Sequence, residues 1–182
     1  MYKFDISTNR PDLLCLEGLS RNLKQYICEH QELPKYSTDD QNSSQEIMIY
    51  KDSSVKNIRP VIICAALKDV EFDKDTLKDF MDYQTKLHST ICRDRKLVSI
   101  GTHDLDKIKA PFRYVSRKPS EISFHALKQD SIMRCDQLMD CLKSDNYLKN
   151  YLKILDGMEE YPFVMDSDND VVSFPPIING IK

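Results

Sequence analysis

Polar side chains that could take part in hydrolysis or ligand binding follow one another closely in one short segment. This segment, the candidate loop, begins at Gly101 and contains Thr102, His103, Asp104 and Asp106. A hydroxyl group, an imidazole and carboxylates are the groups that proteins use for acid–base chemistry and for binding polar ligands. Crowded polar groups on a loop are costly unless water, protein partners or a ligand satisfies their hydrogen bonds. The polar residues therefore indicate the candidate loop as the candidate functional site.

The candidate loop lies between two segments that are predicted to be strands. Residues 97–100 are mostly apolar and end at Gly101, so they predict a short buried strand followed by a turn that favours glycine. Pro111 ends any helical turn, and residues 112–116 alternate as in a second strand. An alternative to a binding role is a loop that satisfies its own polar groups, with His103 held by Asp106.

The rest of the chain alternates between patterns typical of helices and patterns typical of strands. Apolar residues at steps of three and four predict helices over residues 12–30, 73–92, 136–143 and 146–155. Strands are predicted over residues 2–6, 47–49, 122–126, 163–165, 171–174 and, as the most apolar and central one, 59–70. Residues 31–45 are polar and read as an exposed linker or insertion. The expected class is α+β, a single compact domain with mixed or antiparallel sheets packed against several helices.

Composition narrows the class of protein. A chain of 182 residues with 41% hydrophobic content suits one domain with a real core. The longest apolar run, Val61–Leu67, is too short to cross a bilayer, and no signal peptide opens the sequence. We therefore expect a cytoplasmic protein with no membrane partner. Its six cysteines form no paired motif, which predicts buried, reduced thiols.

Positive charge gathers around the candidate loop, although the whole chain carries a net charge of −3. Residues 93–118 hold eight lysines and arginines against three aspartates, a net charge of +5. Two interpretations stay open at this point. The segment is either an ordinary solvated face or a local contact for phosphate groups.

Two other groups of polar residues have residue types that can ligate a metal ion. Asp166, Asp168 and Asp170 have the spacing of a calcium loop, but its glycine and its glutamate are missing, which favours a hairpin turn. His88 and Cys92 could share a zinc ion, but further ligands are not evident, which favours core packing. No metal is therefore expected. The glycine-rich nucleotide loops and the GxSxG motif of serine hydrolases are absent from the sequence.

Three blocks of the sequence resemble a single protein family. They are STNRPDLLCLEGLSR (Ser7–Arg21), LHSTICRDRKLVSIGTHDLDKIKAPFRY (Leu87–Tyr114) and FPPIING (Phe174–Gly180). They are similar to the β subunit of phenylalanyl-tRNA synthetase of the archaeal and eukaryotic type, in particular to its editing (B3/B4) domain. The resemblance assigns residues 1–182 to that domain, with 31–45 as an exposed linker or insertion. Because the family's subunit is several times longer, it also implies an excised domain.

The resemblance implies proofreading. In this family the editing domain hydrolyses tyrosine that has been attached in error to tRNA(Phe), while the aminoacylation site lies in the α subunit. A second site is useful because an apolar pocket rejects an added hydroxyl only by roughly a hundredfold. The implied partners are the acceptor end of tRNA(Phe) and the α subunit of the heterotetramer. No cofactor is implied for this domain, although the full synthetase is expected to use ATP and Mg. The alternative is a catalytically silent module that serves only for structure and tRNA docking.

The resemblance also suggests roles for individual residues. It puts the candidate loop at the family's editing pocket. His103 and Asp104 are the first candidates for catalysis and for contacts with the aminoacyl group. Thr102 and Asp106 are the next candidates for contact with the substrate. A second wall of the pocket is implied at Ile178, Asn179 and Gly180. Candidates for tRNA contact are the basic residues Arg93, Arg95, Lys96 and Arg113. Because no nucleophile with a base is evident, we expect hydrolysis without a covalent intermediate, by water that loop groups and the ribose hydroxyls of the substrate orient.

Overall fold

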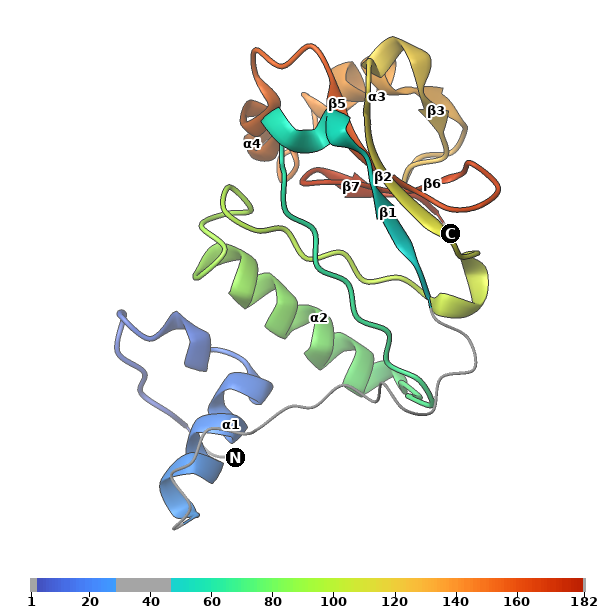
Figure 1. The fold of residues 1–182 in the computed structure, drawn as a ribbon. Coiled ribbons are helices and arrows are strands. Elements are labelled where there is room, and N and C mark those ends of the chain that lie inside the picture. The colour runs from blue at the N-terminus through green and yellow to red at the C-terminus, as the bar shows by residue number, and fades with distance from the viewer. Residues whose placement is uncertain (1–2, 29–46, 182) are drawn as a thin grey trace. The chain divides into compact units, whose positions relative to one another are not determined.

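The computed structural model describes residues 3–28 and 47–181, which cluster into two compact units. Unit 1 contains residues 3–28 and 68–98, and unit 2 contains residues 47–67 and 99–181. Each unit is described by itself (Figure 1). The mixture of separate helices with mainly antiparallel strands confirms the α+β class. The predicted linker at residues 31–45 lies outside the described residues.

Unit 1 is helical. It contains the short 3₁₀ helix η1 (Pro11–Leu13), α1 (Leu16–Ile27) and α2 (Lys74–Ser89), and both η1 and α1 contact α2. The predicted start of α2 is confirmed, because the Asp73 carboxylate accepts hydrogen bonds from the N–H groups of Asp75 and Thr76 at 3.0 and 2.7 Å. The strand predicted over residues 2–6 is wrong for residues 3–6, which pair with no other strand in the described part of the chain.

The centre of unit 2 is a five-stranded sheet in the order β1-β2-β5-β6-β7. Its strands are β1 (Ile49–Lys51), β2 (Phe112–Arg117), β5 (Tyr161–Met165), β6 (Val171–Phe174) and β7 (Ile178–Asn179). Strand β1 runs parallel to β2, and the other neighbours are antiparallel. A smaller sheet pairs β3 (Ser123–Phe124) with β4 (Met133–Arg134). The predictions for the strand at 112–116 and for the hairpin at 163–174 are therefore confirmed.

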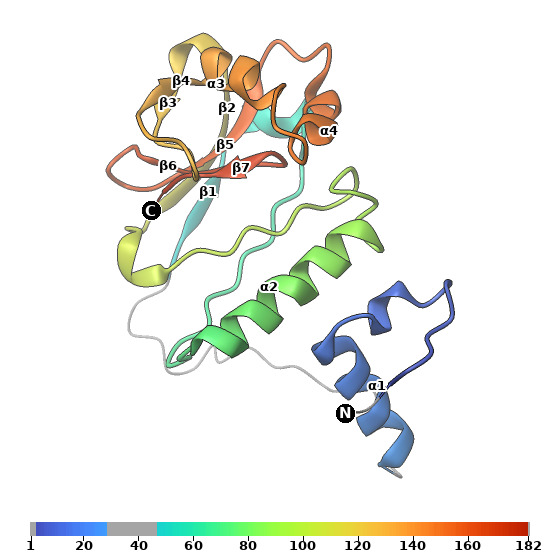
Figure 2. The ribbon, with the colours of Figure 1, turned by 180° about the vertical axis from the view of Figure 1, so that it is seen from behind.

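One face of the five-stranded sheet is covered by helices and by the smaller sheet (Figures 1 and 2). The helices are α3 (Cys135–Leu142) and α4 (Lys149–Leu152), and a 3₁₀ turn, η5 (Lys153–Leu155), continues α4. Phe163 and Phe174 are fully buried on the sheet, with ring centroids 5.0 Å apart, and belong to one apolar cluster with Leu138 and Leu142 of α3. This packing gives the sheet a rigid side, so the strand ends that carry polar groups are held in place.

Two apolar segments that predict buried strands are neither strands nor buried. Residues 60–70 form no regular element, and Val61, Ile63 and Leu67 expose 75%, 89% and 69% of their surfaces. Residues 97–100 also form no strand, and Leu97 and Val98 expose 59% and 49%. A strand needs the backbone groups of a neighbouring strand, and none pairs with these segments among the residues that the structure describes. Apolar composition alone was therefore a misleading signal here.

The cysteines differ in exposure. Cys92 and Cys135 are buried and Cys15 is partly exposed, whereas Cys28, Cys64 and Cys141 are exposed, and all six are free. The expectation of buried thiols is therefore wrong for the exposed three, which lie on surfaces that their apolar neighbours do not cover. Burial raises the pKa of the Cys135 thiol to about 12, so this thiol stays protonated at neutral pH.

We expect the folded chain to show two classes of thiol. A thiol-specific reagent such as Ellman's reagent should react rapidly with the three exposed cysteines and slowly or not at all with Cys92 and Cys135. After denaturation all six should react, and mass spectrometry of alkylated peptides should assign each class. Rapid reaction of Cys135 in the folded chain would contradict the packing around α3.

The helices of the described residues are short. The longest of them, α2, has 16 residues. Across residues 3–28 and 47–181, no helix has both the length and the apolar character that crossing a membrane requires.

Candidate functional site

The candidate loop packs against the β6–β7 end of the sheet, within unit 2. A Cβ atom built on Gly101 would lie 3.1 Å from Nε2 of His103. The same atom would lie 3.4 Å from Oδ1 of Asn179 and 3.6 Å from Oγ of Ser173. The imidazole of His103 thus lies close to the backbone at Gly101, beside polar groups of two strands. The structure brings together the two segments that the sequence resemblance treats as walls of one pocket.

Glycine is needed at position 101 for a different reason from the one predicted. Its φ is not in the left-handed region, so the backbone there is open to any residue. The constraint is space, because a contact of 3.1 Å to a ring nitrogen is tighter than side chains normally make. The absence of a side chain lets His103 and Asn179 approach the same point.

Asn179, which the resemblance puts on the second wall of the pocket, lies in strand β7. It is the partner of Ser173 in the β6–β7 register, and the Ser173 hydroxyl donates a hydrogen bond of 2.8 Å to Oδ1 of Asn179. The backbone oxygen of Asn179 accepts a hydrogen bond of 2.9 Å from the N–H of Leu127. These bonds fix the position of the Asn179 amide, whose nitrogen carries two further donors.

Sequence reasoning missed Ser173. This residue is buried, and its one hydroxyl proton is directed to Asn179, so the geometry does not set it up as a nucleophile activated by His103. A polar residue inside the apolar run VVSF was the available signal, because buried polar groups need a stated partner.

Asp104 has a structural partner within the loop. Its side chain caps the 3₁₀ turn η3 (Leu105–Lys107), where Oδ1 accepts a hydrogen bond of 3.1 Å from the N–H of Asp106. Its other oxygen lies 3.5 Å from Nζ of Lys107. The loop is thus partly self-capped, with Asp104 as the acceptor. A catalytic carboxylate at this position would have to act while it holds this turn.

The site is open to solvent. Thr102, Asp104 and Asp106 are exposed and His103 is half-buried, whereas Ser173 behind them is buried. The imidazole of His103 and the amide oxygen of Asn179 thus lie near the same point at Gly101, on a loop that is mostly exposed. Such a set can position a water molecule and bind a polar ligand by hydrogen bonds.

The basic candidates are divided between the two units. Arg93, Arg95 and Lys96 follow α2 in unit 1, where Arg93 and Lys96 are exposed. Arg113 lies on β2 in unit 2 and donates a hydrogen bond to the Asn169 side chain. The positive segment seen in the sequence is therefore not one continuous face of a single unit.

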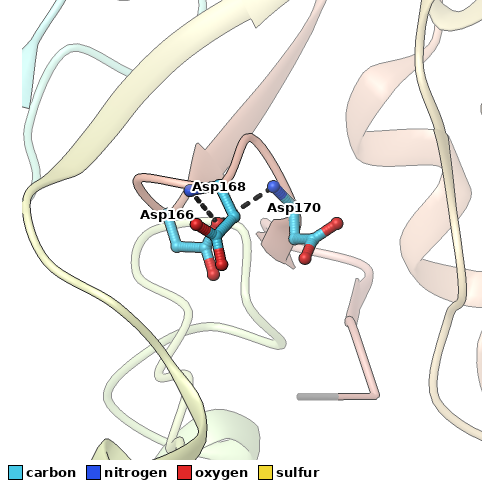
Figure 3. Close-up of side chains that lie close together, drawn as sticks. All are labelled: Asp166, Asp168 and Asp170. Carbon is cyan, nitrogen blue, oxygen red and sulfur yellow. Dashed lines mark hydrogen bonds between the residues drawn. The ribbon is translucent and has the colours of Figure 1, made fainter.

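The aspartates between β5 and β6 form the turn of the predicted hairpin (Figure 3). The buried carboxylate of Asp166 accepts hydrogen bonds of 3.0 Å from the N–H groups of both Asp168 and Asp170. Asp168 also forms an ion pair of 2.6 Å with Lys109. One oxygen from each aspartate lies within 4.8 Å of the others, a spacing that could hold a cation. The prediction that no metal binds here stays a prediction.

Known proteins similar to this chain point in one direction. The family "Phe-tRNA synthetase beta subunit B1 domain" matches residues 1–29. The cytoplasmic phenylalanine–tRNA ligase β subunit of Arabidopsis thaliana is 44% identical over 180 residues, and the Homo sapiens β subunit is 43% identical. A crystal structure of an N-terminal fragment of the Pyrococcus horikoshii phenylalanyl-tRNA synthetase β subunit superposes with a TM-score of 0.78 and 32% identity, over 96% of this chain and 48% of that one.

The chain is related to the N-terminal region of phenylalanine–tRNA ligase β subunits. The similarity covers 99% of this chain but only 30% of the length of the Arabidopsis and human subunits. The family match also changes one assignment. Residues 1–29 match the B1 domain, whereas the resemblance of the sequence blocks assigns these residues to the B3/B4 domain.

Proposed function

We propose that this chain carries the editing site of a phenylalanine–tRNA ligase β subunit and hydrolyses tyrosine that is mischarged onto tRNA(Phe). The observation that carries the proposal is the approach of His103 and Asn179 to the same point at Gly101. The similarity to β subunits of this ligase supports the choice of substrate. The proposal includes the ligase α subunit and the acceptor end of tRNA(Phe) as partners. It also includes a cytoplasmic location, the one named for the Arabidopsis relative.

The proposed chemistry is hydrolysis by a positioned water molecule. An aminoacyl ester is already activated, so the reaction needs chiefly a water molecule in the right place and hydrogen-bond donors for the oxyanion. In this proposal His103 orients the water and Thr102 contacts the aminoacyl group. Asn179 has amide N–H groups to donate to an oxygen of the substrate. No cofactor is proposed for this step, because nothing in it requires the transfer of electrons or of a phosphoryl group.

Selection of tyrosine follows from the same polar groups. A site built to hydrogen-bond the tyrosine hydroxyl leaves its own donors and acceptors unpaired when phenylalanine enters. Sites of this kind can discriminate by roughly 10⁴-fold or more. Asp106 is proposed as a partner of that hydroxyl.

A second candidate function is a docking module without catalysis. It is favoured by one observation, the commitment of Asp104 to capping the loop. In this case the chain would bind tRNA(Phe) but would not hydrolyse its ester.

The test is the release of radiolabelled tyrosine from Tyr-tRNA(Phe), measured with the chain and with the full synthetase. We expect hydrolysis of Tyr-tRNA(Phe) and little hydrolysis of Phe-tRNA(Phe). Gly101→Ala should slow the reaction by about tenfold, because the new Cβ atom must displace the His103 ring by a few tenths of an ångström.

Ser120→Ala is the control, because Ser120 is exposed in unit 2, lies outside the candidate loop and outside strands β6 and β7, and the change adds no atom. Its rate of hydrolysis should equal that of the unmodified chain. If the chain and the full synthetase both bind tRNA(Phe) but neither hydrolyses its ester, the result would favour the docking module. Equal rates for Gly101→Ala and the unmodified chain would place the chemistry elsewhere.

A further inference from the structure

The turn that follows α2 has an unusual backbone. Three successive residues, Arg93, Asp94 and Arg95, have φ values of 51°, 52° and 63°. These are left-handed values, which residues with a side chain adopt rarely and mostly as single residues. Such strain persists only where the surrounding structure holds it, and it is often found at functional sites.

The end of the helix does not account for this turn. A helix commonly ends with one left-handed residue directly after its last turn. Here α2 ends at Ser89, and Thr90 donates hydrogen bonds to carbonyl groups of the last turn. The N–H of Asp94 also satisfies the carbonyl of His88, at 2.8 Å, but that bond does not require three left-handed residues in succession.

The turn is held by bonds on both sides of the strained residues. Lys96 donates a backbone hydrogen bond to Arg93, and Leu97 donates one to Cys92, each of 3.1 Å. Cys92 and His88 are buried, with 3% and 4% of their surfaces exposed, and they anchor the start of the turn. The backbone that carries the side chains of residues 93–96 is thus fixed in one conformation.

Three of the four side chains on this fixed backbone are basic, so residues 93–96 carry a net charge of +2. We propose that this basic turn is a preorganised binding element for RNA phosphates, in which the strained backbone presents the exposed side chains of Arg93 and Lys96 to the ligand. Preorganisation increases affinity, because fewer groups must be ordered when the ligand binds. The proposal rests on the proposed function for the choice of RNA as the partner.

Two substitutions at Asp94 separate backbone order from charge. Asp94→Asn and Asp94→Gly remove the same negative charge, which by itself should strengthen contact with phosphates. Asparagine tolerates the left-handed conformation and keeps the residue restricted, whereas glycine frees the backbone. Any difference in affinity between the two variants therefore reports the order of the turn and not its charge.

The measurement is fluorescence anisotropy at several salt concentrations. The probe is a labelled RNA hairpin that ends in a single-stranded 3′ segment and carries no attached amino acid. We expect Asp94→Gly to bind about 3- to 10-fold more weakly than Asp94→Asn, with the same dependence on salt. Arg93→Gln should reduce the slope of log affinity against log salt concentration by the amount that corresponds to roughly one phosphate contact. Thermal unfolding followed by circular dichroism should show Asp94→Gly to be at least as stable as Asp94→Asn, which excludes unfolding as the cause of weaker binding.

Equal affinities of the glycine and asparagine variants would overturn the proposed preorganisation. An unchanged salt dependence in Arg93→Gln would overturn phosphate binding by the turn. Displacement of the RNA by a polyglutamate peptide at equal charge concentration would show a general site for anions and would overturn the assignment to RNA. Because the probe carries no amino acid, a chain that does not hydrolyse Tyr-tRNA(Phe) would give the same binding results, so the two proposals fail separately.

Discussion

Replacement of His103 by alanine should slow the hydrolysis of Tyr-tRNA(Phe) by about 10- to 1,000-fold, the range for loss of one positioned acid–base or polar group. His103 is half-buried, and its ring lies beside Gly101 together with the side chains of Asn179 and Ser173. Single-turnover rates of tyrosine release would measure the effect. Added imidazole should restore part of the activity if the missing group acts on a proton or a water molecule.

Asp104 supplies the comparison for this experiment. Because its carboxylate caps η3, Asp104→Ala should also slow hydrolysis, through loss of the loop's shape. Asp104→Asn keeps an oxygen that can accept the same hydrogen bond and should stay close to the original rate. A large loss in Asp104→Asn would show instead that the negative charge itself takes part. Full activity of a variant that lacks both His103 and Asp104, or an acyl-enzyme trapped on serine or cysteine, would contradict the proposed site.

Gly180→Ala should destabilise the folded chain strongly, by about 3 kcal/mol or more. A Cβ atom at this position would lie 2.1 Å from the carbonyl oxygen of Val171. That oxygen belongs to the backbone of β6 and cannot turn aside as the end of a side chain can. Gly180 also donates a hydrogen bond of 2.9 Å to Val172 and forms a bridge with Ala126, so the clash would separate β6, β7 and the segment before β4.

Urea unfolding, followed by circular dichroism, would measure this loss as a shift of the midpoint. Gly101→Ala is the suitable comparison, because its new Cβ atom would meet only side-chain atoms that can shift, and it should cost less than about 1 kcal/mol. The two variants therefore separate a defect in folding from a defect in the site. Equal midpoints for Gly180→Ala and Gly101→Ala would contradict the close packing at β6.

The sequence alone determined those elements whose signals lie within a few residues of one another. The alternation after Pro111 predicted β2, and the turn residues around Asp168 predicted the β5–β6 hairpin. The capping residue Asp73 predicted the start of α2. In each case the hydrogen bonds of the cap or turn, or the alternation of apolar and polar side chains, involve residues that are close in sequence. The residue types are therefore enough to predict the element. The clustering of polar residues likewise singled out the candidate loop, and the resemblance of three blocks suggested what it acts on.

Only the tertiary structure decided which distant residues meet. The resemblance put Asn179 on a second wall of the pocket, but nothing in the sequence indicates that Ser173 also lies beside Gly101, because that proximity depends on the register of β6 with β7. The apolar residues 60–70 read as a central strand, but a strand exists only where another strand supplies partners for its N–H and C=O groups. The left-handed turn at residues 93–95 has no signature in residue type at all. Local preferences are weak compared with the backbone pairing and packing that distant segments impose, and these act only once the chain has folded.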